Sequence, residues 1–138
     1  MGVYSGIAQD NVTINSGTAR LQTLTVTGAL TVSGGVRMAV TAVAAAGTNQ
    51  ATAAALAEGL DVVSGADATK GVRLPTAVAG ATVIVKNTAA GALLIYPATG
   101  AAINAISANG SYSITNLTST MLVASSATQW FSVPLVAS

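Results

Sequence analysis

The most constraining feature of the chain is a six-residue unit that occurs twice in succession between positions 24 and 35. The two copies read L-T-V-T-G-A and L-T-V-S-G-G. Their period-two alternation places leucine and valine on one face of an extended segment, and threonine and serine on the other. Because a strand pair this short cannot bury its own apolar face, it needs a partner. The pattern therefore predicts a short β-repeat that associates with other copies of the chain.

The composition strengthens this expectation of self-association. The 138 residues suffice for one domain with a small appendage, and Ala, Gly, Ser, Thr and Val dominate. Small side chains each bury little apolar area, which stabilises a fold by about 25 cal/mol per Å². Only 7% of the residues are charged, compared with about 25% in ordinary soluble domains. Association between copies would supply the burial that this lean core lacks.

Charge and residue usage exclude several kinds of partner and chemistry. The formal net charge is +1 and the five basic residues are scattered, so we expect no nucleic-acid partner. No apolar run approaches the roughly 18 residues of a membrane-spanning helix, so we expect no membrane partner. The chain has neither cysteine nor histidine, which removes disulfides, thiolate nucleophiles, imidazole bases and the usual zinc sites. We therefore expect no metal and no cofactor.

Three parts follow one another along the chain. Positions 1–23 predict an extended N-terminal arm, either a frayed terminus or a segment that orders on a partner surface. Its apolar residues are Val3, Tyr4, Ile7, Val12 and Ile14. After the β-repeat at 24–35, positions 36–138 predict one compact β domain. Short strands recur there about every 8 to 12 residues, which indicates an all-β fold with a β-sandwich, jelly-roll-like or barrel domain.

Turn residues and proline suggest how these strands connect. The β-branched segment 81–87 predicts a strand whose hairpin partner is 92–97. The pair Asn109-Gly110 predicts a second hairpin turn. Pro75 follows a short strand and favours an edge position, because proline lacks a ladder donor. Segments 121–124 and 129–136 predict the last strand pair.

The alanine-rich segment 50–58 leaves two alternatives. Its alanine content, Asn49 before it and Gly59 after it fit a capped helix. Its alternating pattern also permits a strand, and the β-rich surroundings favour that interpretation.

The chain contains few residues that could act in catalysis. A nucleophilic Ser or Thr needs a base, and only Lys70 and Lys86 are available for that role. Glycoside cleavage needs two facing carboxylates, for which Glu58 and Asp61 are the nearest pair in sequence. Solvated loop charges explain these residues more simply. We predict a protein that is not an enzyme, with a hydrolase of cell-surface polymer as a minor alternative.

The aromatic residues also allow two interpretations. Tyr96, Tyr112, Trp130 and Phe131 are nearly all the aromatics in the chain. Buried, they would fill an alanine-rich core; exposed, they would stack on a sugar or on another protein. Burial is the interpretation that the composition favours.

Several segments resemble proteins of bacteriophage particles. The unit at 24–34 is similar to the connector repeats of trimeric phage fibre and decoration proteins. A small β domain found in many phage virion proteins resembles four further segments, G-V-R-L-P at 71–75, A-T-V-I-V-K-N at 81–87, 96–104 and 124–130. The resemblance covers roughly positions 48–132. It implies a homotrimer without enzymatic activity, and it implies strand at 50–57.

The resemblance and the short layout together predict a function. We expect a homotrimeric capsid decoration, or cement, protein that joins through Leu24, Val26, Leu30 and Val32. The arm would bind the major capsid protein, and the domain would project from the capsid exterior. No secretory signal is visible, so synthesis in the host cytoplasm is expected. The alternative is a short tail or head fibre, or a receptor-binding knob that recognises host surface glycan through Trp130 or Tyr112.

Overall fold

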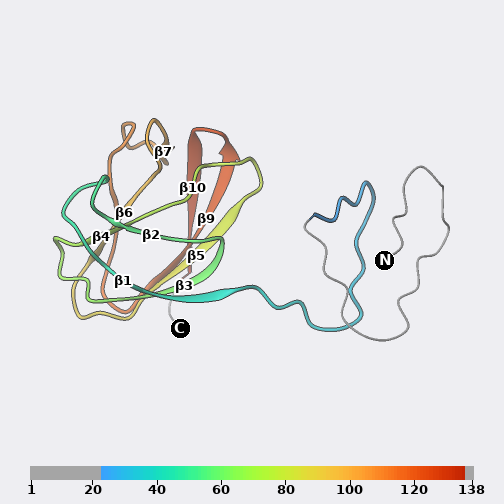
Figure 1. Ribbon diagram of the computed structural model, residues 1–138, viewed down its shortest axis with the longest axis horizontal. Coiled ribbons are helices and arrows are strands. Elements are labelled where there is room, and N and C mark those ends of the chain that lie inside the picture. Colours follow the sequence, from blue (N-terminus) through green and yellow to red (C-terminus); the bar gives the residue numbers. More distant parts are fainter. Residues whose placement is uncertain (1–22, 136–138) are drawn as a thin grey trace. The chain divides into compact units, whose positions relative to one another are not determined.

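The computed structural model describes residues 23–135, so residues 1–22 of the arm predicted at 1–23, with all of its apolar residues, lie outside this range. The chain divides into two compact units, 1–36 and 37–138. The described residues of the second unit, drawn in Figure 1, form strands and no helix. The strands are β1 (Val40–Ala44), β2 (Ala54–Ala55), β3 (Gly59–Ser64), β4 (Gly71–Arg73), β5 (Thr82–Asn87), β6 (Leu93–Tyr96), β7 (Ala102–Ile103), β8 (Tyr112–Ile114), β9 (Ser119–Ser126) and β10 (Gln129–Leu135). The all-β prediction is confirmed.

The strands form two sheets that the chain visits alternately. One sheet has six strands in the order β1-β3-β5-β9-β10-β7, and the other has four in the order β2-β4-β6-β8. From β1 to β6 each strand lies in the opposite sheet from the one before it, and neighbours within each sheet run parallel. This is a solenoid-like coil, so the jelly-roll sandwich predicted from the sequence is wrong. Antiparallel pairing enters only where β8 joins β6 and β9 joins β5 and β10, among the described strands.

The predicted hairpin between 81–87 and 92–97 is also wrong, because β5 and β6 lie in different sheets. The side chain of Asn87 builds the corner between them. Its amide donates to the Gly91 carbonyl at 2.9 Å, and its oxygen accepts from the Ala89 N–H at 3.0 Å. These bonds hold residues 87–91 in a compact bend that leads the chain across to the other sheet.

The turn predicted at Asn109-Gly110 and the strand predicted before Pro75 are both present, but each lies in a different place in the sheets from the one expected. Asn109 has a left-handed φ of 65°, yet the turn links β7 to β8 in the opposite sheet rather than closing a hairpin. The strand before Pro75 is central, since β4 lies between β2 and β6. Proline follows the ladder there and removes no donor from it. The last pair was predicted correctly, because β9 and β10 are antiparallel neighbours.

At 50–58 the structure contains a single turn and a two-residue strand, so the strand alternative holds for Ala54–Ala55 only. Asn49 caps this turn as a helix N-cap would. Its Oδ1 accepts from the Thr52 N–H at 3.1 Å, and its carbonyl accepts from the Ala53 N–H at 3.0 Å. The chain then leaves the turn, because the Leu56 N–H donates to the Arg73 carbonyl at 2.8 Å, beyond the end of the β2–β4 ladder.

The core lies between the two sheets and is built mostly of small side chains. Trp130 is its largest fully buried member, and Asn87 and Thr120 are buried among the apolar residues. The other large apolar members are Leu56, Leu74, Leu93, Ile95, Ile103, Ile114 and Leu122. Valines and alanines fill the remaining positions, as the composition predicted for a lean core.

Among residues 23–135, the repeat at 24–35 has no ladder partner. Residues 23–39 form no strand, so the strand pair predicted at 24–35 is not formed within one chain. The four apolar side chains of the repeat are 43% to 64% exposed: Leu24, Val26, Leu30 and Val32. A segment whose apolar residues stay in water is the state expected before association, because only a partner would cover them.

Candidate functional site

The outer face of the six-stranded sheet carries an apolar row that crosses five strands. Strand register places Val40 beside Leu60, Leu60 beside Ile84, Ile84 beside Met121, and Met121 beside Val133. These residues alternate along their strands with the buried ones, so they point away from the second sheet. Val40 is 65% exposed and Val133 is 43% exposed, while the three central residues are half-buried. We call this set the outer row.

Apolar residues extend the outer row on one side, and a charged residue lies on each of its two sides. Val123 pairs with Phe131 one step along the strands, and Phe131 is 50% exposed. On the opposite side Lys86 follows Ile84 on the same face, and its ammonium donates to the Leu117 carbonyl. Glu58 is exposed and lines a hollow of about 350 Å³ together with Met38, Thr82 and Ile84. The row itself contains no charged or polar residue.

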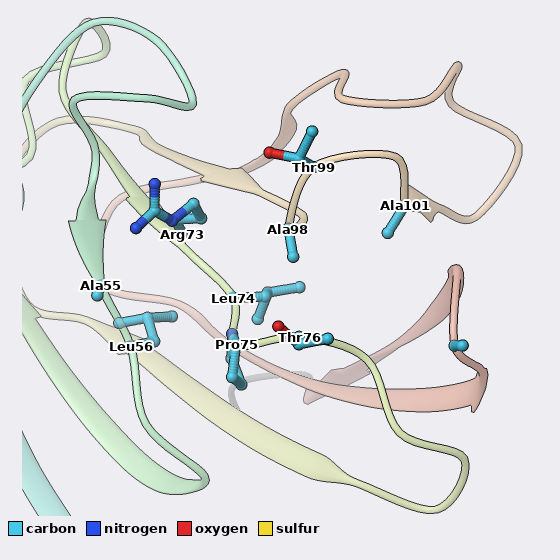
Figure 2. A pocket seen from close by; sticks show the side chains of 10 residues that line it. Ala55, Leu56, Arg73, Leu74, Pro75, Thr76, Ala98, Thr99 and Ala101 are labelled. Atoms are coloured by element: carbon cyan, nitrogen blue, oxygen red, sulfur yellow. The ribbon is translucent and has the colours of Figure 1, made fainter.

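A second hollow of about 410 Å³ opens beside the four-stranded sheet. Figure 2 shows its walls, which come from segments 55–56, 73–76 and 98–101, with Ala127 completing them. Arg73 supplies the charged group among the described residues of the lining, and one of its guanidinium nitrogens donates to the Gln50 carbonyl at 3.3 Å. Thr76 and Thr99 add hydroxyls. The hollow can admit a small polar group, but its lining offers no paired acid and base for catalysis.

Asp61 lies inside the domain rather than on a loop. The interpretation of Glu58 and Asp61 as solvated loop charges is therefore wrong for Asp61. Its side chain is 1% exposed on the inner face of β3. Oδ1 accepts from the Ala57 N–H at 3.4 Å, and Oδ2 has no hydrogen-bond partner among the described residues. Burial raises the pKa of Asp61 above its ordinary value of 3.8, and the Ala57 hydrogen bond opposes that change in part. A carboxyl enclosed in this way cannot face Glu58 across an exposed substrate.

Replacing Asp61 by asparagine should stabilise the domain at neutral pH. A raised pKa means that the folded protein binds the proton more tightly, so stability falls as the pH rises from 3.8 through the raised value. Asp61→Asn keeps the acceptor for Ala57 and removes the buried charge. We expect the free energy of unfolding to rise at pH 7, where the unaltered aspartate carries the buried charge, and to gain less at pH 3, where the carboxyl group is protonated. Urea unfolding followed by Trp130 fluorescence measures both values.

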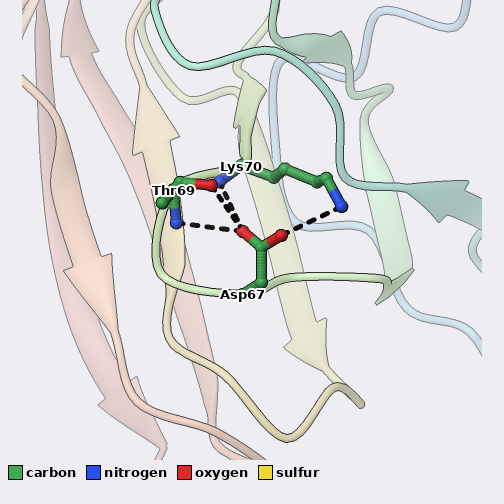
Figure 3. Close-up of polar contacts among 3 residues, drawn as sticks. All are labelled: Asp67, Thr69 and Lys70. Atoms are coloured by element: carbon green, nitrogen blue, oxygen red, sulfur yellow. Dashed lines mark hydrogen bonds and ion pairs between the residues drawn. The ribbon is translucent and has the colours of Figure 1, made fainter.

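The opposite behaviour of Asp67→Asn provides the control for this experiment. Asp67 accepts hydrogen bonds from the Thr69 hydroxyl at 2.7 Å and from the Thr69 and Lys70 N–H groups at 3.1 Å each (Figure 3). An ion pair of 3.0 Å to Lys70 completes the set. The hydrogen bonds from Thr69 and the ion pair with Lys70 hold the pKa of Asp67 well below its usual range. The ionised Asp67 side chain therefore stabilises the domain at pH 7, and this stabilisation is lost as the pH falls. If Asp67→Asn also raised the free energy of unfolding at pH 7, the explanation given for Asp61 would be contradicted.

The structure separates the aromatic residues that the sequence grouped together. Trp130 is fully buried, so it cannot stack on a glycan. Tyr112 is half-buried against the core, and the Tyr96 hydroxyl donates to the Thr48 carbonyl at 3.2 Å. Phe131 is the aromatic that stands on the outer face. The prediction that the aromatic side chains are buried is therefore confirmed for Trp130 and wrong for Phe131.

Two further observations limit what the described residues can do. Within residues 23–135, no group of three or more Asp and Glu side chains lies close enough to hold a metal ion. The same range contains no helix that is long and apolar enough to cross a membrane. Family models, curated protein sequences and solved structures all failed to give a match to this chain.

Sequence reasoning missed the outer row as a candidate surface. The predicted interface residues Leu24, Val26, Leu30 and Val32 are exposed as a site of association requires, and they do not belong to the core cluster of the described residues. A usable signal was present at 82–86, where Val83 and Val85 alternate with Ile84. A strand that is apolar on both faces predicts covering on both faces.

Proposed function

We propose that this protein is a non-enzymatic virion structural protein, a homotrimeric capsid decoration protein that binds and stabilises a phage head. The observation that carries the proposal is the exposed apolar repeat at 24–35, which connects an N-terminal arm to a compact solenoid-like β domain. The resemblance of the repeat and of four segments in the domain to phage virion proteins supports the same assignment. Localisation on the capsid exterior and contact with the major capsid protein belong to this proposal.

The mechanism requires only binding. The arm at 1–23, with Val3, Tyr4, Ile7, Val12 and Ile14 as its apolar contacts, binds the shell, and three copies associate through the repeat. A ligand that binds the assembled shell and not its dissociated subunits stabilises the shell by mass action. At a free concentration 100 times the dissociation constant, this contribution is about 2.7 kcal/mol per site. Multivalent attachment through three arms lowers the concentration that is needed.

Binding to undecorated heads tests this function directly. Heads assembled without this chain are mixed with the purified protein, sedimented, and assayed for bound protein and for resistance to heat. We expect saturable binding at a fixed stoichiometry and a higher temperature of head disruption. The combined variant Leu24→Ser, Val26→Ser, Leu30→Ser and Val32→Ser should bind at least about tenfold more weakly, because single arms replace three.

A matched variant separates the repeat from general surface hydrophobicity. Val78→Ser removes an apolar side chain that is 62% exposed in the loop before β5, and it should bind heads as the unaltered protein does. Failure of the unaltered protein to bind heads would refute the decoration function. Binding to host cells or their surface glycan, without binding to heads, would assign the chain to a fibre or receptor-binding knob.

A further inference from the structure

We propose that the outer row of the six-stranded sheet is a self-association surface, against which the domains of neighbouring copies pack in the homotrimer. The inference rests on the proposed homotrimer and extends it from the repeat to the domain. The occupant of this sheet face is therefore a second copy of the same chain.

The chemistry of the outer row suits contact between identical copies. Side chains near a symmetry axis meet their own counterparts, so a charge placed there would face a like charge. Val40, Leu60, Ile84, Met121 and Val133 supply no charge and no polar group that would lose its water on contact. Glu58 and Lys86 lie to either side of the row, where they can remain solvated. Burying half-exposed apolar side chains gains about 25 cal/mol per Å² removed from water.

The course of the chain leads from the repeat to this row. Only residues 36–39 lie between the end of the repeat and Val40, the first residue of β1 and of the row. Val36 and Met38 continue the alternation of Val40, and they are 78% and 53% exposed. Three chains joined at the repeat must therefore begin their β1 strands near one another. In the sequence, the apolar alternation therefore continues from the repeat through Val36 and Met38 to Val40.

The size of the row indicates that it acts together with the repeat. Five strands at about 4.8 Å separation span about 19 Å, so the row and its flanking positions form a patch of a few hundred Å². A stable interface of standard size buries about 800 Å² on each partner. The patch alone falls short of that area, and the exposed side chains of the repeat add to it. Loss of either part should weaken the trimer.

The edge strand supports a face-to-face contact rather than continuation of the sheet. β1 is the edge of the six-stranded sheet, with β3 as its partner on the other side. The ladder of β1 covers five residues only, from Val40 to Ala44, which limits strand addition by another copy. The face beside it extends across four further strands. The larger apolar area therefore lies on the face and not along the edge.

Substitution at the centre of the row is the first test. Light scattering coupled to size-exclusion chromatography is expected to show a trimer for the unaltered protein. Ile84→Glu places a carboxylate from every copy into the contact, and it should raise the concentration for half-dissociation by at least about 100-fold. Leu94→Glu is the matched control, because Leu94 is half-buried on the outer side of β6 in the other sheet. We expect it to remain trimeric.

Cysteine cross-linking gives a second test that does not depend on a charged variant folding. The chain contains no cysteine, so Val40→Cys introduces a single reactive thiol in each copy. A short bis-maleimide should then produce covalent dimers, whereas Ser113→Cys on β8 should produce none. Far-UV circular dichroism and the emission of buried Trp130 confirm that each variant is folded.

The outcomes distinguish this inference from the decoration function. A monomeric unaltered protein, trimers that persist with Ile84→Glu, or equal cross-linking of the two cysteine variants would each overturn the role of the outer row. Head binding by the unaltered protein would stand regardless of those results. Conversely, a trimer that depends on Ile84 but does not bind heads would support the row and refute the decoration function.

Discussion

Replacing Trp130 by alanine is expected to lower the free energy of unfolding of the domain by about 3–5 kcal/mol. The side chain is fully buried between the sheets and is the largest such residue in the core. The surrounding residues are mostly Ala, Val, Leu and Ile, which cannot extend to fill the space that an indole leaves. Since small domains have total stabilities of about 5–15 kcal/mol, this one change should unfold a large fraction of the protein. Urea unfolding followed by far-UV circular dichroism measures the loss.

The indole nitrogen makes a second, conservative variant informative. Nε1 of Trp130 is buried and has no hydrogen-bond partner among the described residues. An unpaired buried donor costs about 1–3 kcal/mol, so part of the packing energy of the indole is offset by this group. Trp130→Phe loses volume but also removes the orphaned donor, and it should therefore cost less than half as much as Trp130→Ala. Val78→Ala in an exposed loop should change stability by less than about 0.5 kcal/mol. Equal losses for the phenylalanine and alanine variants would contradict this account.

Replacing Asn87 by alanine is expected to cost about 3 kcal/mol or more. The side chain is fully buried and makes three hydrogen bonds, to the Gly91 and Thr115 carbonyls and from the Ala89 N–H. Alanine leaves two carbonyls and one N–H without the partner that the buried amide of Asn87 supplies. The corner between β5 and β6 would also lose the group that fixes it. The measurement is again urea unfolding, here followed by Trp130 fluorescence.

The aspartate variant tests whether the amide group itself is required at this corner. Asn87→Asp keeps an acceptor for the Ala89 N–H, but it directs a carboxylate at the Gly91 and Thr115 carbonyl oxygens. We expect a loss at pH 7 at least as large as that of Asn87→Ala, with partial recovery at low pH when the carboxyl group is protonated. Asn116→Ala, at an exposed position in the nearby turn, should change stability by less than about 0.5 kcal/mol. Tolerance of Asn87→Asp at pH 7 would show that the corner does not depend on the two donated bonds.

The proposed trimer has two contact surfaces, the repeat and the outer row, and only the repeat could be recognised from the sequence. The repeat is visible in the sequence because two identical patterns follow each other and neither can bury its apolar face alone. The outer row contains one residue from each of five strands, and successive members are separated by 12 to 37 positions in the chain. No window of sequence contains this row, since it exists only through the register of the strands. A surface of this kind requires the tertiary structure.

Solenoid-like winding accounts for most of the errors in the predicted connections. Short strands with turn residues between them are equally typical of hairpins and of a coil that crosses from one sheet to the other. Which of the two forms depends on the corner, and here the buried hydrogen bonds of Asn87 direct the chain across. Those bonds reach Thr115, 28 residues further along the chain. Turn propensity is local and contains no information about such a partner.

The sequence alone determined that the chain is all-β, where its strongest strands lie, and that it carries a repeat unable to cover its own apolar face. These follow from alternation, β-branching and the shortage of large or charged side chains, which act within a few residues. The tertiary structure decided which sheet each strand joins, that Asp61 is enclosed, and that an apolar row crosses one outer face. The physical reason is that alternation fixes which residues share a face of a strand. It does not fix which neighbour pairs with that strand, or whether another layer covers the face.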